Sequence, residues 1–280
     1  MKTPFITIAI LATLFILERL FPLRPATRAL VGRLVVNLTL SLLTFGVAML
    51  LVRPAALQAL DWSAAKPFGL LHLVAMPEWA RWVAAFLLLD VAFYYWHVLN
   101  HRVPFLWRFH NVHHFDPDLD VSTGFRFHFG EVAFSTVFRV VQVALIGVSL
   151  PQFAAYEIVF QAGTLFHHSN WHLPRALEKA LNFIIVTPRM HGIHHSQFRD
   201  ETNSNYSVVF SFWDRLHRTL RLGVAQNEIT VGVPGYSSMN DNRILSSLTA
   251  PFRRQRLYWT KSTQSRREAE TQRNQAPLRL

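Results

Sequence analysis

The pattern of hydrophobic and polar positions along this chain contains four long apolar stretches. They cover residues 4–21, 34–52, 82–100 and 132–166, and the segments between them are polar or mixed. About 20 consecutive, mostly apolar residues are enough for a helix to cross a bilayer. The pattern therefore predicts an all-α integral membrane protein, a helical bundle with about four transmembrane helices.

The fourth stretch is too long for one typical span and somewhat short for two. Ser149 and Pro151 lie at its middle, where a turn is natural. Arg139 and Glu157 lie inside it, and charged side chains at membrane depth face protein or the interface rather than lipid. The sequence leaves both a single span and a two-helix hairpin open.

The placement of arginines predicts the orientation of the helices. Arg24, Arg28 and Arg33 form a short basic loop after the first apolar stretch, and such loops face the cytoplasm. With that loop inside, residues 101–131 are also inside. If the fourth stretch is a hairpin, the chain from His167 to the arginine-rich C-terminus is cytoplasmic too, as the positive-inside rule requires.

These features divide the chain into three regions. Residues 1–80 form transmembrane helices and a loop, residues 81–222 form a central domain, and residues 223–280 form a basic tail that we expect to be partly disordered. The net charge of +11 suits nucleic acid or anionic lipid as well as cytoplasmic loops. Because membrane spans precede the tail, we interpret its charge as a topology signal and expect no nucleic-acid partner.

The absence of cysteine limits the possible cofactors. None of the 280 residues is cysteine, which excludes disulfides, thiolate zinc sites, iron–sulfur clusters and thiolate-ligated haem. Any metal must therefore be bound by nitrogen and oxygen.

Histidines recur in four motifs at helical spacing. Residues three or four apart share one face of a helix. Two of the motifs have the pattern HxxHH, and chance would place two in fewer than about 0.001 chains of this composition. All four motifs lie on the cytoplasmic side of the predicted topology. Their ten histidines are His97, His101, His110, His113, His114, His168, His172, His191, His194 and His195.

We interpret these histidines as a metal centre. Ten imidazoles can hold two ions with positions left open, and imidazole suits zinc, copper, iron and nickel. No HExxH or GxSxG motif indicates a hydrolase, which favours redox-active iron beside a membrane, with a lipid C–H bond as substrate. Asp90 is a candidate acceptor for an imidazole N–H, and an ion pair with Arg139 or Arg81 is its alternative. A metal-binding or metal-transporting membrane protein without oxygenase activity is the rival interpretation, although its ligands would be distributed along the spans.

Six segments carry the histidine motifs and their neighbours: DVAFYYWHVLNH, LWRFHNVHH, GFRFHFGE, FHHSNWHLP, TPRMHGIHHS and NYSVVFSFWDRLHRTLR. Together they resemble the fatty acid hydroxylase superfamily, also called the sterol desaturase family. The segment ERLFPLRP resembles its bacterial members, and the resemblance extends from Glu18 to Arg221. It implies an oxygenase of the bacterial inner membrane, with a cytoplasmic helical cap that carries the histidines, which hydroxylates or desaturates a lipid.

The resemblance also implies that the ten histidines bind two iron ions, for which zinc can substitute in purified protein. O2 is the implied co-substrate, and a separate reductase, ferredoxin or cytochrome b5-like protein supplies electrons, since the chain has no GxGxxG motif. Asn170 and Trp171 are expected beside the metals. His128 stands in the family motif RFHP-x-E, but Phe129 replaces the proline, so His128 is expected next to the ligands rather than among them. Three further histidines are assigned no metal: His72, His167 and His217.

Overall fold

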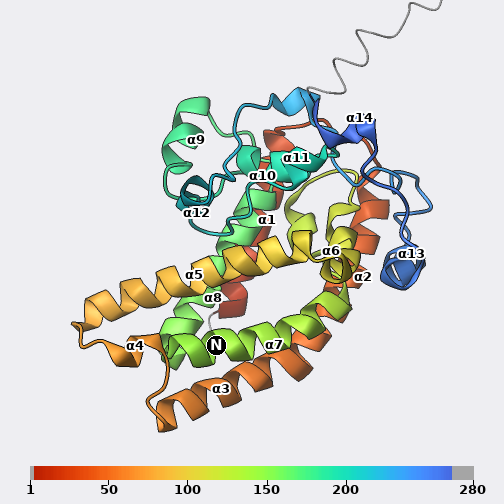
Figure 1. Cartoon of the computed structure of the whole chain (residues 1–280). Coiled ribbons are helices and arrows are strands. Elements are labelled where there is room, and N and C mark those ends of the chain that lie inside the picture. Colours follow the sequence, from red (N-terminus) through yellow and green to blue (C-terminus); the bar gives the residue numbers. More distant parts are fainter. Residues whose placement is uncertain (1–2, 267–280) are drawn as a thin grey trace, which may run out of the picture.

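The computed structural model describes residues 3–266, and within that range the chain is helical and has no β-strand. Figure 1 shows long helices at one end of the molecule and a cap of short helices and loops at the other. The predicted all-α membrane bundle is therefore confirmed. Three segments are long and apolar enough to cross a membrane, namely Leu30–Leu73, Glu78–Arg102 and Phe129–Ile146.

All four apolar stretches of the sequence are helical. The long helices are α1 (Thr3–Leu20), α2 (Leu30–Val47), α3 (Arg53–Ala65), α5 (Glu78–Arg102), α7 (Phe129–Ile146) and α8 (Leu150–His168). A π-helical segment, Ala48–Val52, joins α2 to α3 without a break, so the helix continues well into the mixed region expected after residue 52.

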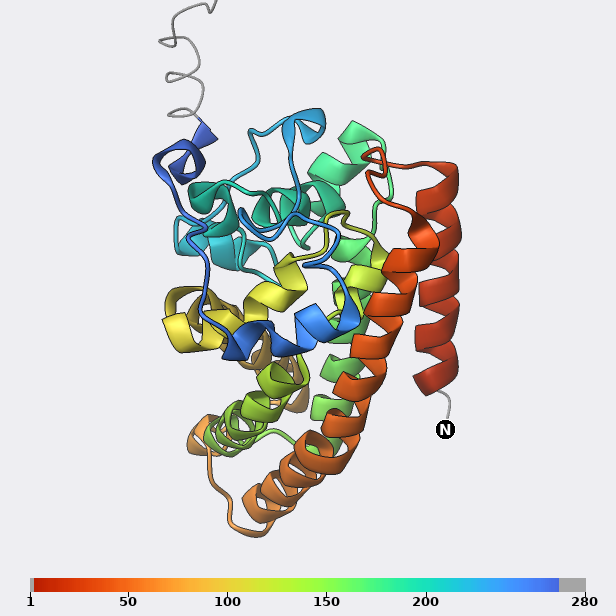
Figure 2. The same ribbon diagram turned by 90° about the vertical axis from the view of Figure 1, so that its right-hand side faces the viewer.

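Short elements build the cap and the connections between the long helices. The α-helices among them are α4 (Leu70–Leu73), α6 (Pro104–His114), α9 (Arg175–Leu181), α10 (Pro188–His194), α11 (Arg199–Thr202), α12 (Phe212–Leu216), α13 (Ile244–Thr249) and α14 (Lys261–Gln264). Three 3₁₀ turns complete the set: η2 (Val121–Phe125), η3 (Gln226–Glu228) and η4 (Ala250–Phe252). In Figure 2 the cap lies above the long helices, on the side where α1 ends and α2 begins.

The fourth apolar stretch forms two helices, α7 and α8, on either side of a turn at Gly147. This glycine has a φ of +76°, and a Cβ at this position would lie 2.6 Å from the carbonyl oxygen of Phe68, so only glycine fits. α7 packs mainly against α3 and α8 against α1, while both contact α5, and the two helices diverge instead of forming a closely packed hairpin (Figure 1). The Arg139 guanidinium joins them through an ion pair of 2.6 Å with Glu157 and lies 4.3 Å from the centroid of the Phe93 ring.

A buried charge network fixes α2 to the loop that follows His114. The Arg33 guanidinium donates from Nε and Nη2 to Asp116, at 2.7 and 2.9 Å, and from Nη1 to Asp120 at 2.8 Å. Asn37 donates to the same Asp116 carboxylate at 2.8 Å. Burial alone would raise the pKa of Asp116, but the charge and hydrogen bonds of Arg33 outweigh it and lower this pKa to about 2. The network therefore holds the chain next to the second histidine motif in place.

Among the residues that the structure describes after residue 222, several pack against the cap. Val233 and Tyr236 pack with Trp107 of α6 in one hydrophobic core. Scattered apolar residues in this region are therefore buried against the cap, although they follow no helical or strand period that the sequence would reveal. The remainder of the predicted tail, residues 267–280, lies outside the described residues.

Candidate metal centre

The structure brings nine of the ten predicted ligands into two adjacent groups. In each group, one nitrogen atom of every ring lies within 4.8 Å of those of the other rings. The five-histidine cluster consists of His97, His101, His110, His114 and His194, and the four-histidine cluster consists of His113, His168, His191 and His195. Every ring is buried except that of His97, which is partly buried.

The two HxxHH motifs divide their histidines between the clusters in the same way. In α6, the first and last members, His110 and His114, join the five-histidine cluster, while the middle one, His113, joins the other. The motif of α10 repeats this division with the clusters exchanged, so that only its middle member, His194, joins the five-histidine cluster. The rings of His114 and His195 stack with 4.3 Å between their centroids, so the two clusters are in direct contact.

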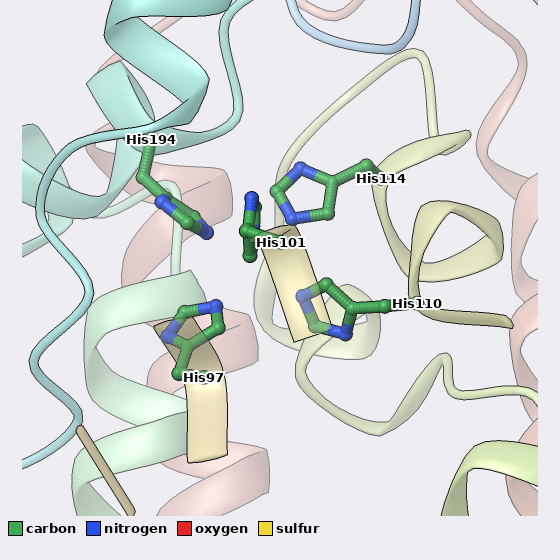
Figure 3. A group of neighbouring side chains, drawn as sticks. All are labelled: His97, His101, His110, His114 and His194. Carbon is green, nitrogen blue, oxygen red and sulfur yellow. The ribbon is translucent and has the colours of Figure 1, made fainter. Parts of the chain in front are cut away.

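The rings of the five-histidine cluster point towards one another (Figure 3). His97 donates from Nδ1 to the carbonyl oxygen of Tyr206 at 2.8 Å, and His194 donates from Nδ1 to that of Ser204 at 2.7 Å. A carbonyl oxygen can only accept, so each bond holds the proton on Nδ1 and leaves a lone pair on Nε2. Among the described residues, the buried Nε2 atoms of His110 and His194 have no hydrogen-bond partner. Such nitrogens are suited to bind a cation.

The Nε2 atoms of the four-histidine cluster lie closer together still. That of His168 is 3.0 Å from Nε2 of His113 and 3.0 Å from Nε2 of His191, which in turn is 3.1 Å from Nε2 of His195. His168 donates from Nδ1 to the carbonyl oxygen of Thr164 at 2.8 Å, and a second backbone carbonyl accepts from Nδ1 of His113 at 3.2 Å. The Nε2 atoms of these two rings therefore face each other as lone pairs, which repel unless a cation lies between them.

The spacing of these nitrogens fits a shared metal ion. Two imidazole nitrogens that bind one ion at about 2.1 Å are about 3.0 Å apart when the bonds are at right angles and about 3.4 Å apart in a tetrahedron. The observed 3.0–3.1 Å matches the right-angled arrangement. The all-nitrogen donor set suits iron as well as zinc, copper or nickel.

The protein environment keeps the imidazoles of the cap neutral. Burial, followed by the proximity of the other rings, lowers the pKa of five of these histidines well below 6.5. They are His113, His114, His191, His194 and His195. Only the neutral ring offers a lone pair to a metal, so the site is ready to bind at neutral pH.

Comparison with known proteins places this centre in a family. The family model "Fatty acid hydroxylase" matches residues 82–219, which include both clusters in full. The chain belongs to the fatty acid hydroxylase superfamily. No solved structure matches this superfamily member.

Three relatives show which enzymes this fatty acid hydroxylase superfamily member is similar to. The ornithine lipid hydroxylase OlsE of Rhizobium tropici is 30% identical over 172 residues, which cover 61% of this chain and 50% of that protein. Human alkylglycerol monooxygenase is 28% identical over 54% of this chain and 32% of its own length, and mouse cholesterol 25-hydroxylase is 30% identical over 48% and 45%. The chain thus spans half or less of the length of these relatives.

The tenth predicted ligand, His172, is not brought to either cluster. Its pairing with His168 assumed a helix that runs through both residues, but α8 ends at His168. The next residues are not helical, the backbone N–H of His172 donates to the carbonyl oxygen of Phe21 at 2.8 Å, and its side chain is exposed. His167, to which the sequence assigned no metal, is buried instead, with its ring centroid 4.1 Å from that of His191.

Replacing His172 by alanine is therefore expected to leave this superfamily member almost unchanged. Substitutions at exposed positions usually alter free energies by less than about 0.5 kcal/mol, so metal content and turnover should stay within about twofold of wild type. Iron analysis and product yield per chain measure both quantities. His168→Ala is the matched control and should lose metal, and an equal loss in His172→Ala would show that this ring does bind.

Within residues 3–266, Asp90 accepts from no imidazole, contrary to expectation, and forms no ion pair with an arginine. Its carboxylate accepts from the Tyr156 hydroxyl at 2.9 Å, from the Phe210 backbone N–H at 3.0 Å and from the Trp213 indole at 2.9 Å. Asp90 therefore joins α5 to α8 and to the segment that leads into α12. It stabilises the frame behind the first histidine motif rather than a ligand.

Glu131, rather than His128 or Asp90, accepts a hydrogen bond from an imidazole of the clusters. His110 donates from Nδ1 to its carboxylate at 2.9 Å, which fixes that ring in the five-histidine cluster. His128 caps the start of α7 instead, where Nδ1 accepts from the Gly130 backbone N–H at 3.0 Å. The GFRFHFGE segment contains both residues, but only the fold shows which of them reaches a ligand.

Removal of the Glu131 carboxylate is expected to weaken metal binding. Loss of a partner that orients a ligating imidazole typically costs 10–100-fold in metal affinity or activity, so Glu131→Ala should fall in about that range. Glu131→Gln keeps an oxygen that accepts the His110 proton and should lose less. Competition with a metal chelator measures the affinity, and Glu78→Ala, at the exposed start of α5, is the control. Wild-type affinity in Glu131→Ala would exclude this role.

Asn170 and Trp171, expected beside the metals, hold the loop between α1 and α2. The Asn170 side chain accepts from the backbone N–H of Arg24 at 3.0 Å and donates to the carbonyl oxygen of the same residue at 2.8 Å. Trp171 forms an isolated β-bridge with Pro22. Both residues lie two or three positions after His168 in the chain, so they tie the N-terminal helices to the four-histidine cluster without joining it.

Proposed function

We propose that this chain is a membrane lipid hydroxylase that uses O2 and two iron ions, one in each histidine cluster. The observation that carries the proposal is the pair of adjacent, buried imidazole clusters with lone pairs facing inwards. The names of the relatives, which are lipid or sterol hydroxylases and a monooxygenase, support the reaction type. They favour hydroxylation over desaturation.

The protein's own part in this reaction is to hold neutral rings in fixed orientations and to keep water out. Backbone carbonyl oxygens hold the Nδ1 protons of His97, His194 and His168, so their Nε2 atoms stay aimed at the clusters. Activation of O2 for attack on a C–H bond is the chemistry that two bound iron ions would supply here. Phe127 stacks on the His113 ring at 4.5 Å with an interplanar angle of 7°, which shields that face from solvent.

The overall reaction fixes what must be delivered to the site. One oxygen atom of O2 enters the C–H bond, and the other leaves as water after taking up two electrons and two protons. We propose that a separate reductase, ferredoxin or cytochrome b5-like protein supplies the electrons. The clusters lie at the cap end of α5, and we propose that this end faces the cytoplasm of a bacterial inner membrane, with the C-terminus on the same side.

Lipid mass spectrometry tests the proposed function. Lipids from cells that express wild type are compared with lipids from cells that express His113→Ala and from cells without the protein. A mass increase of about 16 in one lipid class, dependent on O2 and absent from both controls, is expected for hydroxylation. A decrease of about 2 would indicate desaturation instead. Identical lipids in all three samples, with the protein present in the membrane, would contradict the proposal.

A further inference from the structure

A cleft of about 400 Å³ lies where α1 ends and α2 begins, at the edge of the cap. One wall is the loop between these helices, and the others are the segments around Asp118 and Gln226. Pockets of this size are common for small ligands and lipid headgroups. The charged residues that line the cleft are Arg19, Arg24, Arg28, Arg33, Asp118 and Asp120.

The two aspartates of the cleft are already engaged by the protein. Asp118 accepts from the backbone N–H and the hydroxyl of Thr27, at 2.8 and 2.7 Å, and from the backbone N–H of Arg28 at 2.9 Å. Asp120 accepts from Arg19 at 3.0 Å and from Arg33 at 2.8 Å. The guanidinium groups of Arg24 and Arg28 have no carboxylate partner among the described residues, so the cleft favours an anion.

Arg24 is the most unusual of these arginines. It is only 6% exposed, and among the described residues its Nε and Nη2 atoms have no hydrogen-bond partner, while Nη1 donates to Gln226. Burial, with a smaller effect of Arg189, lowers the pKa of Arg24 to about 10, so the group is still a cation at neutral pH. Two hydrogen bonds between the backbone of Arg24 and the side chain of Asn170 hold this residue in place. A buried cation with open donors is costly unless a ligand completes its hydrogen bonds.

The buried guanidinium lies directly against α10, which carries His191 and His194. A Cβ on Gly192 would overlap Nη1 of Arg24, so the absence of a side chain at this position allows the contact. Gly192 stands between His191 of the four-histidine cluster and His194 of the five-histidine cluster. An anion bound by Arg24 would therefore sit just outside the metal centre.

Exposed apolar side chains extend from the cleft along α1, which ends there, and along α2, which begins there. On α1, Ile16 and Leu20 are exposed, and on α2, Val31, Val35 and Leu38 are exposed. α2 belongs to a segment that is apolar enough to cross a membrane, so its exposed side chains are suited to contact hydrocarbon. A ligand that satisfies both surfaces has an anionic head and an apolar body, as a bilayer lipid does.

We propose that the cleft binds the phosphate or carboxylate headgroup of the lipid substrate, whose hydrocarbon chains lie along α1 and α2. That the bound lipid is the substrate rests on the proposed hydroxylase function, whereas the binding itself does not depend on turnover. Because Arg24 touches the helix of His191 and His194, the site selects lipids by charge close to the carbon that reacts.

Binding of short-chain lipids to the purified full chain tests the site. Native mass spectrometry from a neutral detergent compares phosphatidylglycerol, phosphatidylcholine with the same acyl chains, and inorganic phosphate. Wild type is expected to bind phosphatidylglycerol at least about tenfold more tightly than phosphatidylcholine, and Arg24→Gln to lose this preference. Arg28→Gln, at the exposed rim, should reduce the preference about threefold or more and does not disturb the buried loop. Arg175→Gln, exposed on α9, is the control of equal charge and should match wild type.

Three outcomes would overturn the site. The first is wild-type preference in both Arg24→Gln and Arg28→Gln. The second is no preference in wild type, which would leave an acidic protein as the occupant of the cleft. The third is inorganic phosphate that binds as tightly as the lipid, which would make the ligand a free anion. Charge-selective lipid binding without any turnover would instead reject the hydroxylase function and leave the site standing.

Discussion

His194→Ala is expected to abolish lipid hydroxylation, with turnover reduced by roughly a thousandfold or more. The ring is fully buried, its Nδ1 proton is held by the Ser204 carbonyl oxygen, and its Nε2 atom faces the five-histidine cluster. Alanine offers no nitrogen there, and metal chemistry supplies several kcal/mol of transition-state stabilisation, of which about 1.4 kcal/mol corresponds to a factor of ten. Product per chain, measured with purified protein and a reducing system, gives the loss.

A matched control separates loss of metal from loss of fold. His72→Ala removes an exposed imidazole far from both clusters in the sequence and should keep wild-type turnover. Helical circular dichroism of metal-free wild type and metal-free His194→Ala should agree, because the substituted ring packs among other imidazoles rather than in a hydrophobic core. Turnover and iron content at wild-type levels in His194→Ala would show that the cluster is not the reactive centre.

Arg33→Met is expected to destabilise the fold more than any substitution on the surface of the cap. The guanidinium is buried and bonds both Asp116 and Asp120, so its removal takes away the ion-pair partner of the buried Asp116 carboxylate and leaves Asp120 paired with Arg19 only. Breaking a buried ion pair by removing one partner typically costs about 3–5 kcal/mol. Denaturant unfolding in detergent measures the change, and Arg175→Met is the control for loss of an exposed arginine, with an expected change of less than about 0.5 kcal/mol.

A second substitution tests the cause of that loss. If uncompensated charge is responsible, Asp116→Asn in the Arg33→Met background should recover part of the stability, and the two effects will not add. Additive losses would mean that Arg33 stabilises the protein by packing alone. Since the network holds the loop after His114, Arg33→Met should also weaken metal binding.

The membrane helices and most members of the two histidine clusters could be predicted from the sequence because both depend on local spacing. Apolar stretches long enough to span a bilayer became helices, and HxxHH placed three imidazoles on one side of a short helix. Spacing cannot show which cluster each imidazole joins. On that side of the helix, residues i and i+4 point in nearly the same direction, whereas residue i+3 is rotated away from both. Only the packed structure shows that His110 and His114 belong to one cluster and His113 to the other.

The structure departs from the expected arrangement where the chain leaves its local pattern. His172 lies at a helical distance from His168, but the helix ends between them, and its backbone bonds with Phe21 far away in the sequence. The acceptors that orient the rings are mostly backbone carbonyl oxygens, as for Ser204 and Tyr206, and these have no sequence signature. The packing of the C-terminal segment on Trp107 likewise depends on long-range contacts of irregularly spaced residues.

Iron content of the purified, iron-loaded protein tests the central claim most directly, with wild type compared with one variant from each cluster. His194→Ala empties a position in the five-histidine cluster and His195→Ala one in the four-histidine cluster. The account predicts one iron ion for each cluster in wild type and a clear loss of iron in both variants. A wild-type protein that binds no iron, or two variants that bind as much as wild type, would contradict it.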